Sequence, residues 1–152
     1  MYKYPNIVYC EIGEFVNINL GAQNNSETGS FFSFSNGNVY SLQDAYNNQE
    51  IIDLVYYYDD FEKLEESIIS SPGGNIDAAF TGDYGMSNWS TRNTIRFGRE
   101  KLSITIDQFE QAENDSLLIA NSFAFESGGR KTKFLEPGDM YSFVREDNVK
   151  GI

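Results

Sequence analysis

The side chains best suited to chemistry are four carboxylates in and just after one apolar segment. Asp53 lies inside the run of residues 51–58, and Asp59, Asp60 and Glu62 follow it. An isolated ionised carboxylate is costly to bury, so Asp53 is either a site carboxylate, such as a metal ligand, or an acid paired with backbone donors, a hydroxyl group or an arginine. The paired state is favoured, because structural networks also hold buried acids.

The acids that follow the apolar segment could hold a hard cation. Ligands gather beyond the carboxyl ends of strands in open α/β sheets, and carboxylate oxygens suit Ca²⁺ or Mg²⁺. Together with Asp53, residues Asp59, Asp60 and Glu62 would then form the metal centre of a hydrolase or phosphatase. Their spacing matches no EF-hand loop, however, and a solvated acidic turn is the simpler interpretation.

Trp89 and Tyr84 are an aromatic pair that could bind a sugar. Both fall in a polar stretch, residues 82–93, which is predicted to be a loop. An exposed pair would stack on a glycan, whereas a single tryptophan more often folds back over a core. The core position is favoured and predicts that Trp89 is partly buried.

The 152-residue chain contains no histidine, and this excludes several catalytic systems. Ser-His-Asp triads, Cys-His pairs and HExxH zinc sites cannot be built from it. Its single cysteine, Cys10, cannot form an intramolecular disulfide. The remaining residues form no recognisable catalytic signature, so no cofactor is expected and a binding role is favoured over an enzymatic one.

Charge and hydropathy limit the partners. The formal net charge of −12 would repel phosphate, so nucleic acid is not an expected partner. No apolar run approaches the roughly 18 residues of a transmembrane segment. The nine residues before Cys10 are too few for a signal peptide, so none is expected in this chain, although a full-length precursor could carry a lipid anchor.

The expected elements are mostly strands. Residues 51–58 have apolar side chains on both faces and predict a central strand covered on both sides. Alternation in residues 14–20 predicts a half-buried strand. Residues 31–35 predict another strand, and Asn36-Gly37 predicts a type I′ turn that leads back through residues 38–40.

Capping patterns predict the helices. Ser41 and Thr105 each begin a capping-box-like sequence, which predicts a helix over residues 42–49 and a second helical region from 106 to 120, interrupted at 114–115. Strand, helix and strand over residues 38–58 suggest a crossover. Further strands are expected at 67–71, 94–97 and 140–145, an extended segment at 76–80, and the start of one more strand after a turn at 147.

These elements predict a single α+β domain over residues 1–152. It would contain a mixed, largely antiparallel sheet on which two short helical regions pack. Residues 1–11 would form an N-terminal extension, and the last strand would be truncated after residue 152.

Seven short phrases of the sequence occur in a characteristic order. They are LGAQ (20–23), GNVYS (37–41), AYNNQ (45–49), IDLVYYY (52–58), SPG (71–73), SNW (87–89) and ENDSLLIA (113–120). Together they resemble an uncharacterised domain of secreted proteins and lipoproteins of Bacteroidetes, from about residue 20 to residue 151. The resemblance implies an extracytoplasmic setting, in the periplasm or at the cell surface, and carries over no catalytic or binding residue.

The expected function is therefore that of a non-enzymatic domain of a bacterial cell-envelope protein that binds a protein or a glycan. Trp89 and Tyr84 are its candidate ligand-binding residues. The alternative is a metal-dependent hydrolase or phosphatase that uses Asp53, Asp59 and Asp60.

Overall fold

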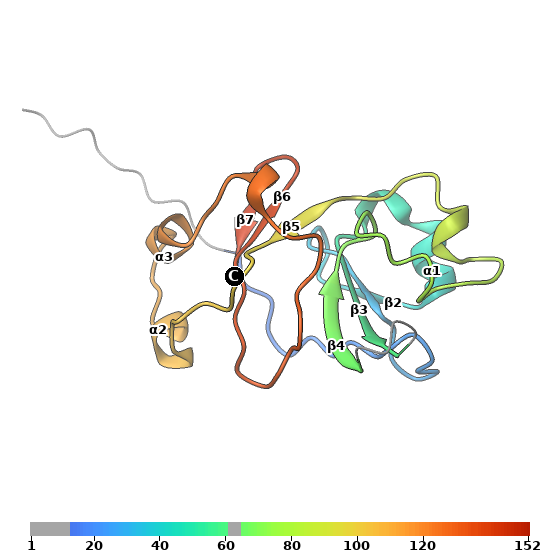
Figure 1. Cartoon of the computed structure of the whole chain (residues 1–152), viewed down its shortest axis with the longest axis horizontal. Helices are drawn as coiled ribbons and strands as arrows, with labels where there is room; N and C mark the ends of the chain where they lie inside the picture. The colour runs from blue at the N-terminus through green and yellow to red at the C-terminus, as the bar shows by residue number, and fades with distance from the viewer. Residues whose placement is uncertain (1–12, 61–64) are drawn as a thin grey trace, which may run out of the picture.

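Seven strands and three short α-helices make up the described part of the chain, residues 13–60 and 65–152 of a computed structural model (Figure 1). The strands form two antiparallel sheets, one of four strands and one of three. This confirms the predicted α+β fold, with the difference that the strands are divided between two sheets. None of the helices in these residues has the length and apolar character needed to cross a bilayer.

The first sheet contains the predicted central strand. Its order is β2 (Val39–Tyr40), β1 (Phe31–Phe32), β3 (Leu54–Asp59) and β4 (Glu66–Ser70). Along β3 the side chains alternate between buried and partly or fully exposed. The strand therefore lies inside the sheet as expected, but only one of its faces is fully covered.

The predicted crossover is confirmed. β1 pairs antiparallel with both β2 and β3, so β2 and β3 run parallel to each other. They are connected by α1 (Leu42–Asn47) and the 3-10 helix η1 (Gln49–Ile51). The Ser41 side chain caps α1 by accepting a hydrogen bond from the Asp44 amide, and Ala45 lies in the core.

The core lies on the covered face of the first sheet. Phe31, Val55, Tyr57 and Ile68 from the strands pack there with buried residues of the segment between β4 and β5, namely Ile76, Phe80, Met86 and Trp89. The expectation that residues 76–80 are extended is wrong. The Ala79 amide donates to the Ile76 carbonyl at 3.0 Å, and this turn lets both Ile76 and Phe80 face the core.

The second sheet has the order β5 (Ile95–Phe97), β6 (Phe143–Arg145) and β7 (Lys150–Gly151). Between β5 and β6 the chain forms α2 (Ile106–Glu110), α3 (Ser116–Ala120) and the 3-10 helix η3 (Phe125–Ser127). The capping box at Thr105 is present as predicted. Neither α2 nor α3 buries a residue, so only α1 packs on a sheet in the expected way.

Two segments join the sheets. At the end of β4, the Ser71 hydroxyl accepts a hydrogen bond from the Ile95 amide at 3.0 Å. Residues 129–132 then run along both sheets, because Gly129 bridges to Phe97 of β5 and Lys131 bridges to Ser70 of β4. The two sheets are therefore held edge to edge by backbone hydrogen bonds.

The predicted strand at residues 14–20 is wrong. These residues pair with no strand of the described chain, and Val16 is 62% exposed. Asn17 has a φ of 57°, which breaks an extended course. Phe15 contacts the sheet through its ring, which lies 5.4 Å from that of Phe32. A segment in which apolar and polar residues alternate forms a β-strand only when another strand pairs with it, and no described strand pairs with residues 14–20.

The hairpin of β1 and β2 is confirmed, but its turn is not of type I′. Ser33 and Asn38 close a four-residue loop, in which the Gly37 amide donates to the Ser33 carbonyl at 2.9 Å. Gly37 has a φ of 71°, whereas Asn36 does not have a positive φ. Asn36 instead uses its side chain, whose Oδ1 accepts from the Asn38 amide at 3.1 Å.

We expect Gly37→Val to lower the free energy of unfolding by about 1–2 kcal/mol, the cost of left-handed backbone for a residue with a Cβ. A Cβ here would also lie 3.1 Å from Cε1 of Phe15. Urea denaturation measures the change. Gly37→Asn is the matched control, because asparagine adopts positive φ at lower cost. Equal stability of the wild type and the valine variant would show that the turn is described incorrectly.

Candidate functional site

Asp53 is the buried acid at the centre of the site. It lies one residue before β3 and is 3% exposed. Its Oδ2 accepts a hydrogen bond from the Phe34 amide at 2.7 Å, and its Oδ1 lies 3.2 Å from Nη1 of Arg145 in β6. Asp53 is therefore paired with a backbone donor and an arginine, and it links the two sheets.

Arg145 is held from its other side by Asp147. The two side chains form a bidentate ion pair, with Nε–Oδ1 at 2.8 Å and Nη2–Oδ2 at 2.5 Å. Hydrogen bonding to Arg145 lowers the pKa of Asp147 to about 2, and the same contact raises the pKa of Arg145 above its ordinary value. The guanidinium is thus fixed between one buried and one exposed carboxylate.

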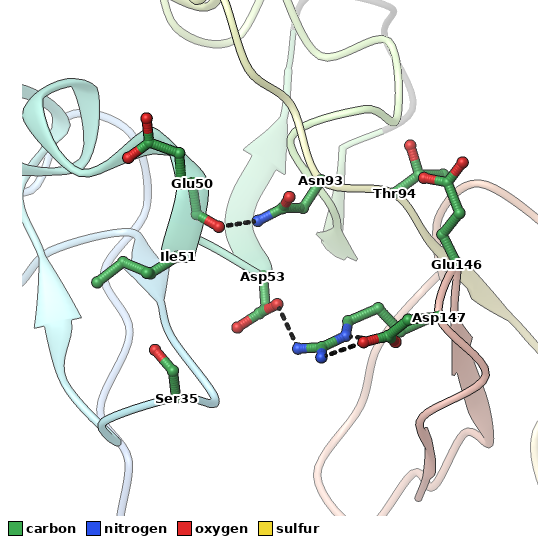
Figure 2. A pocket seen from close by; sticks show the side chains of 9 residues that line it. Ser35, Glu50, Ile51, Asp53, Asn93, Thr94, Glu146 and Asp147 are labelled. Atoms are coloured by element: carbon green, nitrogen blue, oxygen red, sulfur yellow. Dashed lines mark hydrogen bonds and ion pairs between the residues drawn. The ribbon is translucent and has the colours of Figure 1, made fainter.

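A groove of about 520 Å³ lies around this ion pair, between the two sheets (Figure 2). Its lining is contributed by the β1–β2 hairpin, η1, the approach to β5 and the β6–β7 turn. The residues are Ser35, Glu50, Ile51, Asp53, Asn93, Thr94, Arg145, Glu146 and Asp147. Asn93 stiffens one wall, because its side-chain amide donates to the carbonyls of Glu50 and Ile52 at 2.9 and 2.8 Å.

The groove is negatively charged. Four of its lining residues are acids and one, Arg145, is a base. Arg145 is already engaged by Asp53 and Asp147. Glu50 and Glu146 are exposed on opposite sides of the groove in Figure 2, and neither forms an ion pair within residues 13–60 and 65–152. These two carboxylates are open to a ligand.

The acids of the predicted metal centre lie apart. Asp53 and Asp59 are at opposite ends of β3, six residues and therefore about 20 Å from each other. Asp59 is buried, with its Oδ2 3.8 Å from Nζ of Lys131, and Asp60 is exposed. Glu62 lies outside the described residues. Among those that are described, no three acidic or cysteine side chains come close enough to hold a metal ion.

The proposed sugar-binding pair is divided between core and surface. Trp89 is 6% exposed, and its ring lies 5.5 Å from that of Phe31 in the core. Its Nε1 donates to the carbonyl of Tyr84 at 2.9 Å. Tyr84 is 38% exposed and packs against Tyr46 at 5.5 Å. The position of Trp89 fits the core interpretation and is more buried than expected.

Sequence reasoning missed the other residues of the groove. Arg145 is 92 positions from Asp53, so no local spacing could connect them. The one available signal was the need of a buried carboxylate for a cationic or hydrogen-bonding partner. Glu50 and Glu146 carry no signal of their own, because exposed acids are common on any surface.

We expect Trp89 to report its buried position directly. Its emission should be blue-shifted and resistant to acrylamide, and Trp89→Ala should lower the free energy of unfolding by about 3–5 kcal/mol, as for other buried aromatic residues. Trp89→Phe should cost less, because it keeps an aromatic ring next to Phe31. Emission near the water-like limit, quenched freely by acrylamide, would contradict the buried position.

We expect the two carboxylates on Arg145 to differ in their contribution to stability. Asp53→Asn should cost about 1.5–3 kcal/mol, the range for buried hydrogen bonds to a charged group. Asp147→Asn should cost less than about 1 kcal/mol, because its side chain is 57% exposed. Urea denaturation of both variants tests this. Equal costs would mean that burial does not distinguish the two contacts.

Comparisons of the chain with protein-family models, curated proteins and solved structures find no match. The resemblance to the Bacteroidetes domain therefore stays a prediction, and functional inference depends on the groove and its chemistry.

Proposed function

We propose that this chain is a non-enzymatic, extracytoplasmic domain of a bacterial cell-envelope protein, and that it binds a partner protein through the groove between its two sheets. The supporting observation is the construction of the groove. Its one base is fixed by two carboxylates, while Glu50 and Glu146 remain open on opposite sides. The extracytoplasmic setting comes from the family resemblance.

The charge of the groove favours a partner segment with lysine or arginine side chains. Such a side chain would lie between Glu50 and Glu146 and would have the carbonyl and hydroxyl oxygens of the groove as further acceptors. A glycan is less well supported. None of the nine lining residues is aromatic, and the Trp89 ring is in the core. Stacking on an aromatic face is the usual way to hold a sugar ring.

The metal-dependent hydrolase has less support than binding, because Asp53 is engaged by Arg145 and lies at the end of β3 opposite to Asp59. A rise in melting temperature with Ca²⁺, Mg²⁺ or Mn²⁺, lost in Asp59→Asn and Asp60→Asn, would favour the enzyme. A cation at about 100 times its Kd would add about 2.7 kcal/mol of stability.

Nuclear magnetic resonance with short peptides tests the proposal. The probe is a pentapeptide with an acetylated N-terminus and an amidated C-terminus, so that its central arginine is its only charge. It should shift the amide signals of Glu50, Thr94 and Glu146. The same peptide with citrulline in place of arginine keeps the shape but not the charge, and we expect it to cause no shifts. Glu50→Gln with Glu146→Gln should weaken binding about fivefold, because two exposed ion pairs contribute about 1 kcal/mol together.

The control for net charge is Glu27→Gln with Glu126→Gln. Both residues are exposed and lie outside the groove lining, so this double variant should bind as the wild type does. The proposal fails if the two double variants weaken binding equally, because attraction would then depend on net charge alone. It also fails if neutral oligosaccharides shift the groove signals and the arginine peptide does not.

A further inference from the structure

A second surface, separate from the groove, is formed by residues 103–123, which we name the α2–α3 arm. It leaves the body of the protein after β5 and contains α2 and α3, which Figure 1 shows at one end of the molecule. Within the described residues 65–152, no residue of the arm is buried. Ile106 is 51% exposed and Ile119 is 59% exposed.

Within the described residues, the hydrogen bonds, ion pairs and cation–π contact that attach the arm to the body lie at its two ends. On one side, the Leu102 amide donates to the Met140 carbonyl at 2.8 Å, and Nζ of Lys101 lies 2.7 Å from Oδ2 of Asp139. On the other side, Arg96 lies 5.3 Å from the ring of Phe125. The hydrogen bonds of residues 103–123 join residues of the arm to one another, such as the capping box at Thr105.

Two short helices without buried residues are not stable by themselves. Helices of five residues are far below the roughly 12–15 residues that are marginally stable alone in water, and most helical stability in proteins comes from packing of an apolar face. The arm has apolar side chains for such packing. They are Ile104, Ile106, Phe109, Leu117, Leu118, Ile119 and Phe123.

The charge of the arm is of one sign. It contains Asp107, Glu110, Glu113 and Asp115 and no lysine or arginine. None of these four acids forms an ion pair with the described residues. Asp107, Glu110 and Glu113 are exposed, as are Ile106 and Ile119. Exposed apolar and acidic side chains on one segment are complementary to a chain that carries apolar and basic side chains.

We infer that the α2–α3 arm is a docking surface for a basic amphipathic segment of a partner protein. The apolar side chains of the partner segment pack on Ile106 and Ile119, and the lysine or arginine side chains of that segment pair with the carboxylates of the arm. A second copy of this chain is a poor occupant, because a two-fold contact would place the acids of one arm against those of the other. An anionic bilayer would be repelled in the same way.

Binding of designed peptides tests this inference. The probe is an 18-residue peptide of leucine and lysine at helical spacing, about 27 Å long as a helix. The comparison peptide has glutamate in place of each lysine. We expect the lysine peptide alone to bind, and Ile106→Ser with Ile119→Ser to weaken it at least tenfold, measured by anisotropy of the labelled peptide. This variant keeps the net charge of −12, so simple attraction of a basic peptide to an acidic protein is unchanged.

The matched control is Val16→Ser with Val149→Ser, which removes apolar side chains that are 62% and 44% exposed outside the arm. It should bind as the wild type does, and Trp89 emission should show that both variants are folded. Three results would each overturn the inference: no binding of the lysine peptide, binding to the Ile106→Ser, Ile119→Ser variant as tight as to the wild type, or binding of the glutamate peptide as tight as that of the lysine peptide. So would a dimer in sedimentation velocity that dissociates in the isoleucine variant, because the occupant would then be a second copy.

Discussion

The ion pair between Asp53 and Arg145 is the buried side-chain contact that fixes how the two sheets meet at the groove, in addition to the hydrogen bonds along their edges. It joins the start of β3 to the end of β6, and the same Asp53 carboxylate also accepts from the Phe34 amide. The Phe34 ring in turn stacks on Phe143, at 5.1 Å and 7° between planes, only two residues before Arg145. One buried carboxylate and one pair of rings thus bring the β1–β2 hairpin and the second sheet together. A buried charge left without its partner is costly, so this contact disfavours any packing of the sheets that separates Asp53 from Arg145.

The same contact explains why the groove is acidic. Arg145 is the one base in its lining, and its positive charge is shared between Asp53 and Asp147. The exposed acids on the walls are therefore not neutralised from within. The side-chain amide of Asn93 holds one wall, and backbone hydrogen bonds close the β6–β7 turn of the other, so the groove is formed before any ligand arrives. A preformed site loses less conformational entropy on binding than a mobile one.

The α2–α3 arm differs from the body of the protein in the hydrogen bonds that hold it. The body of the protein is closed by hydrogen bonds between distant segments, such as Ser71 with Ile95 and Thr132 with Ile69. The arm forms only local ones, and its apolar side chains remain partly or largely exposed. The groove is polar and lies between segments that are distant in sequence, whereas the arm is held by local hydrogen bonds and is partly apolar. Both surfaces carry negative charge, in keeping with the net charge of −12.

Local chemistry in the sequence was sufficient for the caps at Ser41 and Thr105, for the β1–β2 hairpin and for the interior position of β3. Each depends on residues only a few positions apart or on one long apolar run. The alternation at residues 14–20 and the apolar residues at 76–80 had no such support, because their conformation depends on whether a strand or a core lies beside them. Tertiary structure alone decided that Asp53 meets Arg145, 92 positions away, and that Asp59 does not join it. The sequence pattern indicates which side chains must be buried or paired. Which side chain pairs with which follows from the packing of segments that are distant in sequence.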